Sequence, residues 1–530
     1  MSETYPRVLS VGDSAVSVEL GASLDEQTVG QVRALDDRLR AQALPGILES
    51  VPTYASLLVL YDRRRLTFSE LSETLRHLAR GLPNSTAPGR LVEIPALYDG
   101  EDLDEVAQGC GLTKEAVVEL HSGREYTALM LGFSPGFAYL GFVDERLRRP
   151  RLKTPRTRVP AGAIGIAGPQ TGIYPRALPG GWNLLGRTSV SLFDSLAPLP
   201  DAPGARSPSL LMPGDRVRFV PALSLAPTPA APKTEYRGSG VRVLEPGLLT
   251  TIQDGGRKGL RRVAVPLTGF ADKGAARTAN QCVGNPCDAP AMEICGPGLR
   301  LLFEKTTFVA LAGASVTADL ERGDLGSGPM PMPLNVAVRA RASNILTIRG
   351  VEDGVRAYVA IAGMNAPRVL GSASADLGSG FLRPLQTGDR LSVEAVDAER
   401  VRREPMAVAP RKTMVRVILG PQSDHFDERT LGTFFSAPWR VGLDSDRVGA
   451  RLDGPRLPHS GPAEIVSDGM VPGCVQVPPD GRPIVMLSDC PTTGGYPKIA
   501  CVVNADLGLI AQATPGRTAI RFVAVRIEDV

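Results

Sequence analysis

Short runs of alternating apolar and polar residues, broken by turns, dominate the hydrophobic pattern of this chain. The segment Tyr5–Leu20 alternates on both sides of a Gly-Asp turn, which predicts a β-hairpin. Apolar residues at helical spacing over 25–42 predict a helix, and a second helical pattern follows Thr67, which can form a capping box with Glu70. Residues 1–88 are therefore predicted to form a small α+β lobe.

Three similar turn-and-strand units divide the rest of the chain. They lie at residues 213–219, 387–393 and 515–522, and each joins a Gly-containing turn to an alternating strand. This repetition predicts three β-barrel lobes. Residues 222–236 are rich in Ala and Pro and have no periodicity, as is typical of an interdomain linker.

The predicted fold is mainly β, with an α+β lobe at the amino end and tandem barrels after it. One helix is predicted in the second half, from Lys273 to Cys282, and Asp272 is placed to cap it. The predicted domains are the lobe at 1–88, a barrel at 89–222, the linker at 223–237, and two further barrel lobes at 238–410 and 411–530.

Composition narrows the class of protein. A chain of 530 residues is too long for one core. Its net charge of +3 predicts no general affinity for nucleic acid or for anionic membranes. The polar start and the lack of a long apolar run predict a cytoplasmic protein without a signal peptide or membrane span. Seven cysteines without a CxxC motif are expected to be reduced, and with four histidines no metal site is expected.

A basic, Gly- and Pro-rich stretch is the first candidate for chemistry. Residues 146–158 carry seven Arg or Lys side chains, and the Gly-rich residues that follow can expose backbone N–H groups. Together they can bind a carboxylate or phosphate, although a solvated basic loop beside tight turns is the alternative. Residues 181–188 nearly match a phosphate-binding P-loop, with Arg187 in place of Lys, but the required flanking strand and helix are not predicted.

His121 and Asp272 can each be either a catalytic or a structural residue. His121 ends a short helical pattern, so it is either a general acid or base or a structural cap. Asp272 has the same ambiguity, because it also suits a helix cap. The sequences TGIYP at 171–175 and TGGYP at 493–497 echo each other and predict matching loops in two related lobes.

Several long motifs, in order along the chain, resemble two subunits of one enzyme. LGFSPGFAYLG (131–141), VPAGAIGIAGPQTGIYP (159–175) and PGGWNLLGRT (179–188) resemble the B subunit of bacterial 5-oxoprolinase, also called KipI or allophanate hydrolase subunit 1. LEPGLLTTIQDGGRKG (244–259) and TTGGYPKIA (492–500) resemble the C subunit of the same enzyme, also called KipA or allophanate hydrolase subunit 2. Two subunits that are usually separate are joined in one chain.

The resemblance implies cyclophilin-like β-barrels and an activity. With a separate A subunit, and with ATP and Mg²⁺, such a complex hydrolyses the small molecule 5-oxoproline to glutamate, and a homo-oligomer of the complex is possible. The resemblance places the site in the cleft between the first barrel and the second half. His121 and Asp272 are the candidates for proton transfer. The candidate binding residues are Arg156, Gln170, Thr171, Tyr174 and Arg187 from the first half, and Asn280, Arg447, Gln476, Thr493 and Tyr496 from the second half.

The chain departs from the family pattern at two positions, and two alternative functions remain open. Phe270 stands where the family has a small residue, and Lys273 stands where it has an acidic or small one. The same barrels resemble the carboxyltransferase part of biotin-dependent urea carboxylase, although this chain has no biotin-attachment segment. The other alternative is a non-catalytic regulator of a sensor histidine kinase. The sequence does not decide which half binds ATP.

Overall fold

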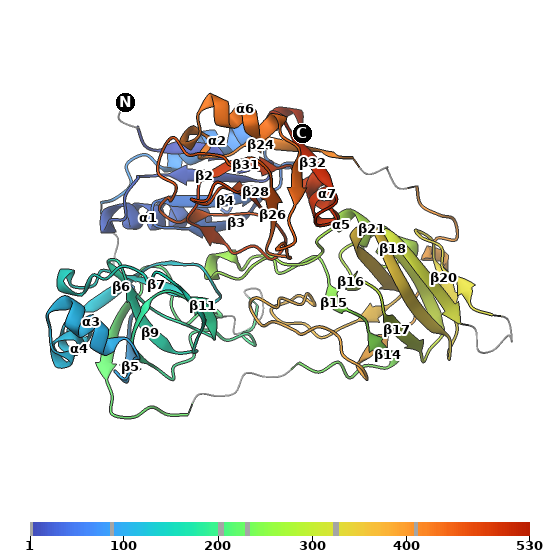
Figure 1. The fold of residues 1–530 in the computed structure, drawn as a ribbon, viewed down its shortest axis with the longest axis horizontal. Helices are drawn as coiled ribbons and strands as arrows, with labels where there is room; N and C mark the ends of the chain where they lie inside the picture. The colour runs from blue at the N-terminus through green and yellow to red at the C-terminus, as the bar shows by residue number, and fades with distance from the viewer. Residues whose placement is uncertain (1–3, 85–88, 200–205, 228–233, 322–327, 408–411) are drawn as a thin grey trace.

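The chain folds into one α+β lobe and three β-rich lobes (Figure 1). The computed structural model describes residues 4–84, 89–199, 206–227, 234–321, 328–407 and 412–530. Part of the predicted linker, 228–233, lies outside this range. Over the described residues as a whole, strands outweigh helices, which confirms the mainly β fold class. In the described residues, no helix is long and apolar enough to cross a membrane.

The amino-terminal lobe is a four-stranded sheet covered by two helices. The strand order is β1-β2-β4-β3, and the predicted hairpin forms its first two strands. Asp25 caps the first helix, and Thr67 and Glu70 form the predicted capping box of the second. The elements are β1 (Arg7–Ser10), β2 (Ala15–Glu19), α1 (Glu26–Gln42), β3 (Ile47–Pro52), β4 (Ser56–Tyr61) and α2 (Phe68–Leu78).

The second lobe is built on a seven-stranded sheet in the order β12-β9-β10-β7-β6-β13-β5. Its last strand lies parallel to its first, and two short helices pack beside it. The elements are β5 (Leu91–Ala96), α3 (Leu103–Cys110), α4 (Lys114–Ser122), β6 (Glu125–Leu131), β7 (Ala138–Gly141), β8 (Arg156–Val159), β9 (Ala163–Ala167), β10 (Gln170–Ile173), β11 (Leu178–Gly180), β12 (Asn183–Arg187) and β13 (Arg216–Pro221).

The third lobe is a ten-stranded sheet organised by two long antiparallel strands, β18 (Thr307–Glu321) and β21 (Ile345–Ile361). The predicted helix α5 (Lys273–Cys282) packs on both of them. The other strands are β14 (Gly240–Pro246), β15 (Leu249–Gln253), β16 (Ala291–Cys295), β17 (Leu299–Phe303), β19 (Met330–Pro331), β20 (Val338–Ala340), β22 (Met364–Asn365) and β23 (Arg390–Val393).

The last lobe is a closed barrel in the order β24-β31-β28-β29-β26-β25-β32. Its strands are β24 (Met414–Leu419), β25 (Trp439–Val441), β26 (Gly449–Asp453), β28 (Cys474–Gln476), β29 (Ile484–Met486), β31 (Lys498–Val502) and β32 (Ala519–Ala524). Outside the barrel lie α6 (Glu428–Ser436), α7 (Leu507–Ala511) and the paired strands β27 (Asp468–Gly469) and β30 (Thr493–Gly494).

The amino-terminal lobe packs on this last barrel, more than 400 residues away in sequence (Figure 1). One apolar core joins Val11, Val51 and Leu58 of the lobe to Met470 and Met486 of the barrel. These side chains have at most 5% of their surface exposed, so the contact buries apolar surface as a domain core does. The two halves of the chain are therefore interlocked, and do not merely follow one another.

A buried polar cluster lies in the same interface. Lys498 Nζ donates to Asp468 Oδ2 at 2.8 Å, and both side chains are buried. Gln422 Nε2 donates to Glu19 Oε1 at 3.1 Å. Burial, reinforced by the charge of Asp468, raises the pKa of Glu19 to about 7. Glu19 and Asp468 also line a cavity of about 340 Å³ between the lobe and the barrel.

Candidate functional site

Asp272, at the amino end of α5, is held from two lobes. Its Oδ1 accepts a hydrogen bond from Ala275 N at 3.0 Å, which is the cap that the sequence predicted. Its Oδ2 accepts a hydrogen bond from Gln512 Nε2 at 2.9 Å, across the contact with the last barrel. Gly508 packs so closely that a Cβ there would lie 2.9 Å from Asp272 Oδ1. The carboxylate is thus oriented by both lobes.

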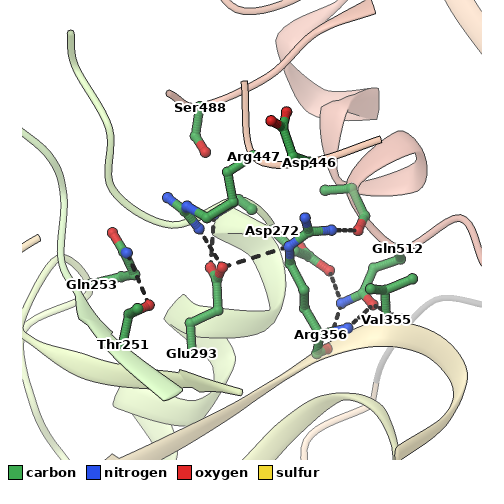
Figure 2. Close-up of polar contacts among 12 residues, drawn as sticks. Thr251, Gln253, Asp272, Glu293, Val355, Arg356, Asp446, Arg447, Ser488 and Gln512 are labelled. Carbon is green, nitrogen blue, oxygen red and sulfur yellow. Dashed lines mark hydrogen bonds and ion pairs between the residues drawn. The ribbon is translucent and has the colours of Figure 1, made fainter. Parts of the chain in front are cut away.

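Gln512 fixes this contact through the backbone of β21. Its Oε1 accepts hydrogen bonds from the N–H groups of Val355 and Arg356, and its Nε2 also donates to Arg356 O (Figure 2). One amide side chain therefore binds the strand and holds Asp272 at the same time. Any shift between the two lobes would move the Asp272 carboxylate.

A buried ionic network lies beneath Asp272. Glu293 accepts hydrogen bonds from Ala271 N at 3.1 Å and from Tyr358 Oη at 2.8 Å. It also forms ion pairs with Arg447 and, at 3.5 Å, with Arg356 (Figure 2). Burial alone would raise the pKa of Glu293, but the two guanidinium groups outweigh it and hold the pKa below its ordinary value. Glu293 is therefore ionised.

Arg447 binds a second carboxylate on its other side. Its Nε donates to Asp489 Oδ2 and its Nη2 to Asp489 Oδ1, each at 2.9 Å, and Nη2 also donates to Gly269 O at 2.6 Å. Burial raises the pKa of Asp489 to about 6 in spite of this pairing. Glu293 and Asp489 thus share one guanidinium but titrate in different pH ranges. Environments that separate two carboxyl groups in this way are typical of acid–base sites.

Two adjoining cavities open beside Asp272. They have volumes of about 440 and 420 Å³, and they lie between the amino end of α5 and the segment around α7. The residues that line both are Asp272, Gly274, Ala505 and Gly508. A carboxylate that is fixed in position and borders a cavity can accept or deliver a proton to a bound molecule.

The second lobe touches the last barrel close to this region. Gly132 packs so tightly that a Cβ there would lie 2.4 Å from Thr493 Oγ1. Gln170 Nε2 donates to Tyr54 Oη at 2.7 Å, which joins the second lobe to the amino-terminal lobe. We call these contacts the barrel junction. They place Thr493 where the first barrel meets the second half, and Gln170 where the first barrel meets the amino-terminal lobe.

The barrel junction and the Asp272 cavities are connected by a short segment. Ser488 lines one cavity, and Thr493 is at the barrel junction. Five residues span at most about 18 Å when fully extended. The segment therefore limits the distance between Ser488 and Thr493 to about 18 Å, and the described residues show no single cavity that holds both clusters.

His121 makes its hydrogen bonds inside the second lobe. Its Nδ1 and Tyr98 Oη are 2.8 Å apart, and its Nε2 and Thr171 Oγ1 are 2.8 Å apart. It is fully buried, and burial lowers its pKa to about 3, so the ring is neutral. His121 and Thr171 therefore hold the second lobe together. A catalytic role for His121 stays a prediction that this geometry does not favour.

Three of the seven basic residues in the basic stretch pair with nearby acids, namely Arg146, Arg148 and Arg156. Arg146 pairs with Asp144 at 2.9 Å, and Arg156 pairs with Glu101 at 2.7 Å and with Asp102 at 2.6 Å. These contacts support the interpretation of a solvated basic loop.

The P-loop-like residues 181–188 contain strand β12 and no helix, so they do not form a P-loop. Arg187, within them, pairs with Asp99 at 2.8 Å.

The other predicted binding residues are spread out. Tyr174 is buried among aromatic side chains. Asn280 donates to Ala289 O at 2.8 Å and shapes a loop after α5. Gln476 donates to the backbone of Tyr496, which lines a separate cavity of about 580 Å³. The predicted matching loops are wrong in detail, because Thr171 and Thr493 lie in strands β10 and β30.

Glu293 and Asp489 were missing from the predicted site. Glu293 sits in the otherwise apolar strand AMEIC, and a charge in such a strand is a signal of a buried ion pair. Asp489 follows β29 in an irregular segment and gives no comparable signal. In the described part of the chain, no three His, Cys, Asp or Glu side chains are arranged to hold a metal ion.

Comparison with known proteins gives the family. The family profile "Carboxyltransferase domain, subdomain A and B" matches residues 263–524, and "Carboxyltransferase domain, subdomain C and D" matches residues 6–202. The C subunit of 5-oxoprolinase from Escherichia coli K12 is 37% identical over 295 residues, which cover 54% of this chain and 92% of that protein. The B subunit of 5-oxoprolinase from Escherichia coli O157:H7 is 42% identical over 221 residues, which cover 41% of this chain and 95% of that protein. This chain belongs to the family of the B and C subunits of 5-oxoprolinase.

Other members and neighbours fit the same assignment. The crystal structure of TTHA0988 superposes with a TM-score of 0.83 at 39% identity, covering 96% of this chain and 99% of that chain. The urea amidolyase of Lachancea kluyveri is 30% identical over 323 residues, which cover 55% of this chain but only 17% of that protein. Within the family, Asp272 and Arg447 belong to the C-like half and Gln170 to the B-like half. The barrel junction is therefore the contact between two subunit-like parts.

Proposed function

We propose that this chain is a component of an ATP-dependent 5-oxoprolinase, in which it combines the roles of the B and C subunits and acts with a separate A subunit. One observation carries the proposal. The two halves match nearly the full lengths of those two subunits, and they share a buried core. Their fusion suits an enzyme that needs both parts at once. ATP, Mg²⁺ and a cytoplasmic location follow from this function.

The chemistry of the reaction explains what the chain must supply. The carbonyl carbon of a lactam is a poor electrophile, and ATP would supply a phosphoryl group that turns the lactam oxygen into a better leaving group. The chain would bind and orient the lactam, exclude water and hold the protons. Asp272 is the carboxylate best placed to hold a proton, because it is rigid and borders a cavity. The phosphates of a nucleotide would need cationic side chains and backbone N–H groups, which are present at the amino end of α5.

The proposed location is the region from the barrel junction to the Asp272 cavities. It contains residues of both subunit-like halves, namely Gln170 and Thr493 at one end and Asp272 and Arg447 at the other. A site shared between the two halves explains why neither half would be active alone.

The decisive experiment mixes the purified chain with the A-subunit homologue from the same source, 5-oxoproline and Mg-ATP. Glutamate and ADP should form in equal amounts and should vanish when either protein is omitted. ADP without glutamate would point to ATP chemistry on another substrate. Neither product, with a folded chain, would refute the proposal.

Substitutions then test the two candidates for proton transfer. Asp272→Asn should reduce turnover by about 100-fold or more, as expected for the loss of a general acid or base. His121→Ala tests the other candidate, and circular dichroism should show that each variant is folded. Full turnover by Asp272→Asn would remove Asp272 from the mechanism.

The carboxyltransferase part of a biotin-dependent urea carboxylase is the second candidate. The matching carboxyltransferase profiles and the urea amidolyase relative favour it. Carboxybiotin and urea in place of ATP and 5-oxoproline would test it, with carboxylated urea as the expected product.

A further inference from the structure

One wall of the 420 Å³ cavity is cationic. Lys273 and Arg277, one turn apart on α5, both line it, and among its described lining residues Asp272 is the only acid. Polar groups of Thr268 and Ser488 also border the cavity. Lysine and arginine side chains near a cavity of this size are suited to an anion with several oxygen atoms.

Further charged residues near Lys273 and Arg277 contribute to the local charge. Lys273 is exposed on α5, and the like charges of Arg277, Lys258 and Arg261 act on its ammonium group. Asp288 acts in the opposite direction and pairs with Lys258 at 3.2 Å and with Arg277 at 3.0 Å. Lys273, Arg277, Lys258 and Arg261 thus stand against Asp288 and Asp272, so four cations face two carboxylates and the local charge is positive.

Arg261 adds a buried positive charge that acts on Lys273. Its side chain is 1% exposed, and its Nε and Nη1 have no hydrogen-bond partner among the described residues. A buried guanidinium with unused donors is costly unless a negative charge lies nearby. Its Nη2 donates to Met470 O, and Glu49 Oε2 accepts a hydrogen bond from its backbone N–H at 3.0 Å, so Glu49 offsets part of the charge. Arg261 does not line the cavity, but its charge acts on Lys273, which does, so an anion bound there would offset more of it.

The amino end of α5 strengthens the same field. The Ala275 N–H is already paired with the Asp272 carboxylate, while Gly274 in the same turn lines the cavity without a side chain that would screen the partial positive charge of the first-turn N–H groups. The cationic side chains, the amino end of α5 and the buried Arg261 therefore all favour an anionic ligand.

We propose that this cavity is an oxyanion-binding site that holds a carboxylate or phosphate group of a small ligand, between α5 and the last barrel. The proposal deepens the proposed function and rests on it only for the ligand's identity. In that setting the oxyanion is either the carboxylate of 5-oxoproline or glutamate, or a phosphate group of the nucleotide. Asp272, at the edge of the same cavity, would then lie next to the bound molecule.

Binding is tested on the full chain alone, without turnover. Isothermal titration calorimetry is run with 5-oxoproline, L-glutamate, inorganic phosphate and ADP as separate probes, at low and high salt. At least one probe should bind with 1:1 stoichiometry, and its affinity should fall with salt, because the contact is ionic. The probe that binds distinguishes the carboxylate source from the phosphate source.

Lys273→Gln should weaken binding by about tenfold or more, since it removes a charged contact. Lys153→Gln is the matched control, because Lys153 is exposed in the basic stretch of the second lobe and far from this cavity in sequence. Ala505→Phe, at an exposed position that lines the cavity, should also abolish binding without unfolding the chain.

The outcomes separate the two proposals. Binding that survives Lys273→Gln and Ala505→Phe, or that is lost with Lys153→Gln, would overturn the oxyanion site. No binding by any probe would overturn it too, even if the complete enzyme produced glutamate and ADP. Binding that depends on Lys273, with no glutamate formed in the complete mixture, would support the site and refute the oxoprolinase function.

Discussion

Glu19 makes the contact between the first and last lobes sensitive to pH. Its pKa is about 7 in the folded chain, against an ordinary value of 4.5. Between these two pH values the folded protein keeps Glu19 protonated, while the unfolded chain has released the proton. The stabilisation from Glu19 is complete below pH 4.5 and is lost as the pH rises through 7. At 1.36 kcal/mol for each pKa unit, the loss is about 3 kcal/mol at pH 8.

Glu19→Gln should remove this loss. An amide is neutral at every pH and keeps a similar shape. The unfolding free energy of the variant should therefore exceed that of the parent by less than about 1 kcal/mol at pH 5 and by about 3 kcal/mol at pH 8. The chain has two tryptophans, so a Trp182→Phe background leaves Trp439 in the last barrel as the only fluorescent indole. Urea unfolding followed by its emission reports on the barrel that contacts Glu19.

Glu73→Gln is the matched control, since Glu73 is exposed on α2 of the same lobe. It should change the unfolding free energy by less than about 0.5 kcal/mol at either pH. A stabilisation by Glu19→Gln that is equal at pH 5 and pH 8, or absent at pH 8, would show that the burial of this carboxyl group is wrongly described.

Three further predictions test the contacts between lobes. Arg447→Met should leave Glu293 without its main partner and lower the unfolding free energy by about 3–5 kcal/mol in urea titrations, and a change below about 1 kcal/mol would argue against the network. Gly132→Val should force the barrel junction apart, because its Cβ would collide with Thr493, and small-angle scattering should show a larger radius of gyration. Gly432→Ala, in open space on α6, is its control and should leave the radius unchanged. The two halves, expressed separately without the linker, should co-purify through their shared core, and failure to associate would show that this core is weak.

Local elements were predictable because their signals are local. The capping box at Thr67 and the cap at Asp272 lie within four residues of the helices they start, and both helices form as expected. Helix α6 was missed, although Asp427 caps it in the same way, because no long apolar stripe marks it. Short elements of this kind carry too few periodic residues to stand out.

The site was less predictable, because it depends on contacts between distant segments. Asp272 and Arg447 could be found from their motifs, but their link through Glu293 joins strand β16 of the third lobe to a loop of the last barrel. Arg187 and Arg156 looked like anion-binding groups in sequence, and in the fold they pair with acids on the loops beside them. Charge along a sequence does not reveal which charges meet.

The packing of the first lobe on the last barrel has a consequence for gene architecture. Arg7, near the start of the chain, pairs with Asp424 at 3.0 Å, and both chain ends lie on the same side of the molecule (Figure 1). A circular permutant that is opened between residues 222 and 236, and joined by an added linker from the carboxyl end to the amino end, should therefore keep the core that the first lobe shares with the last barrel. The two halves of this assembly could then be encoded in either order.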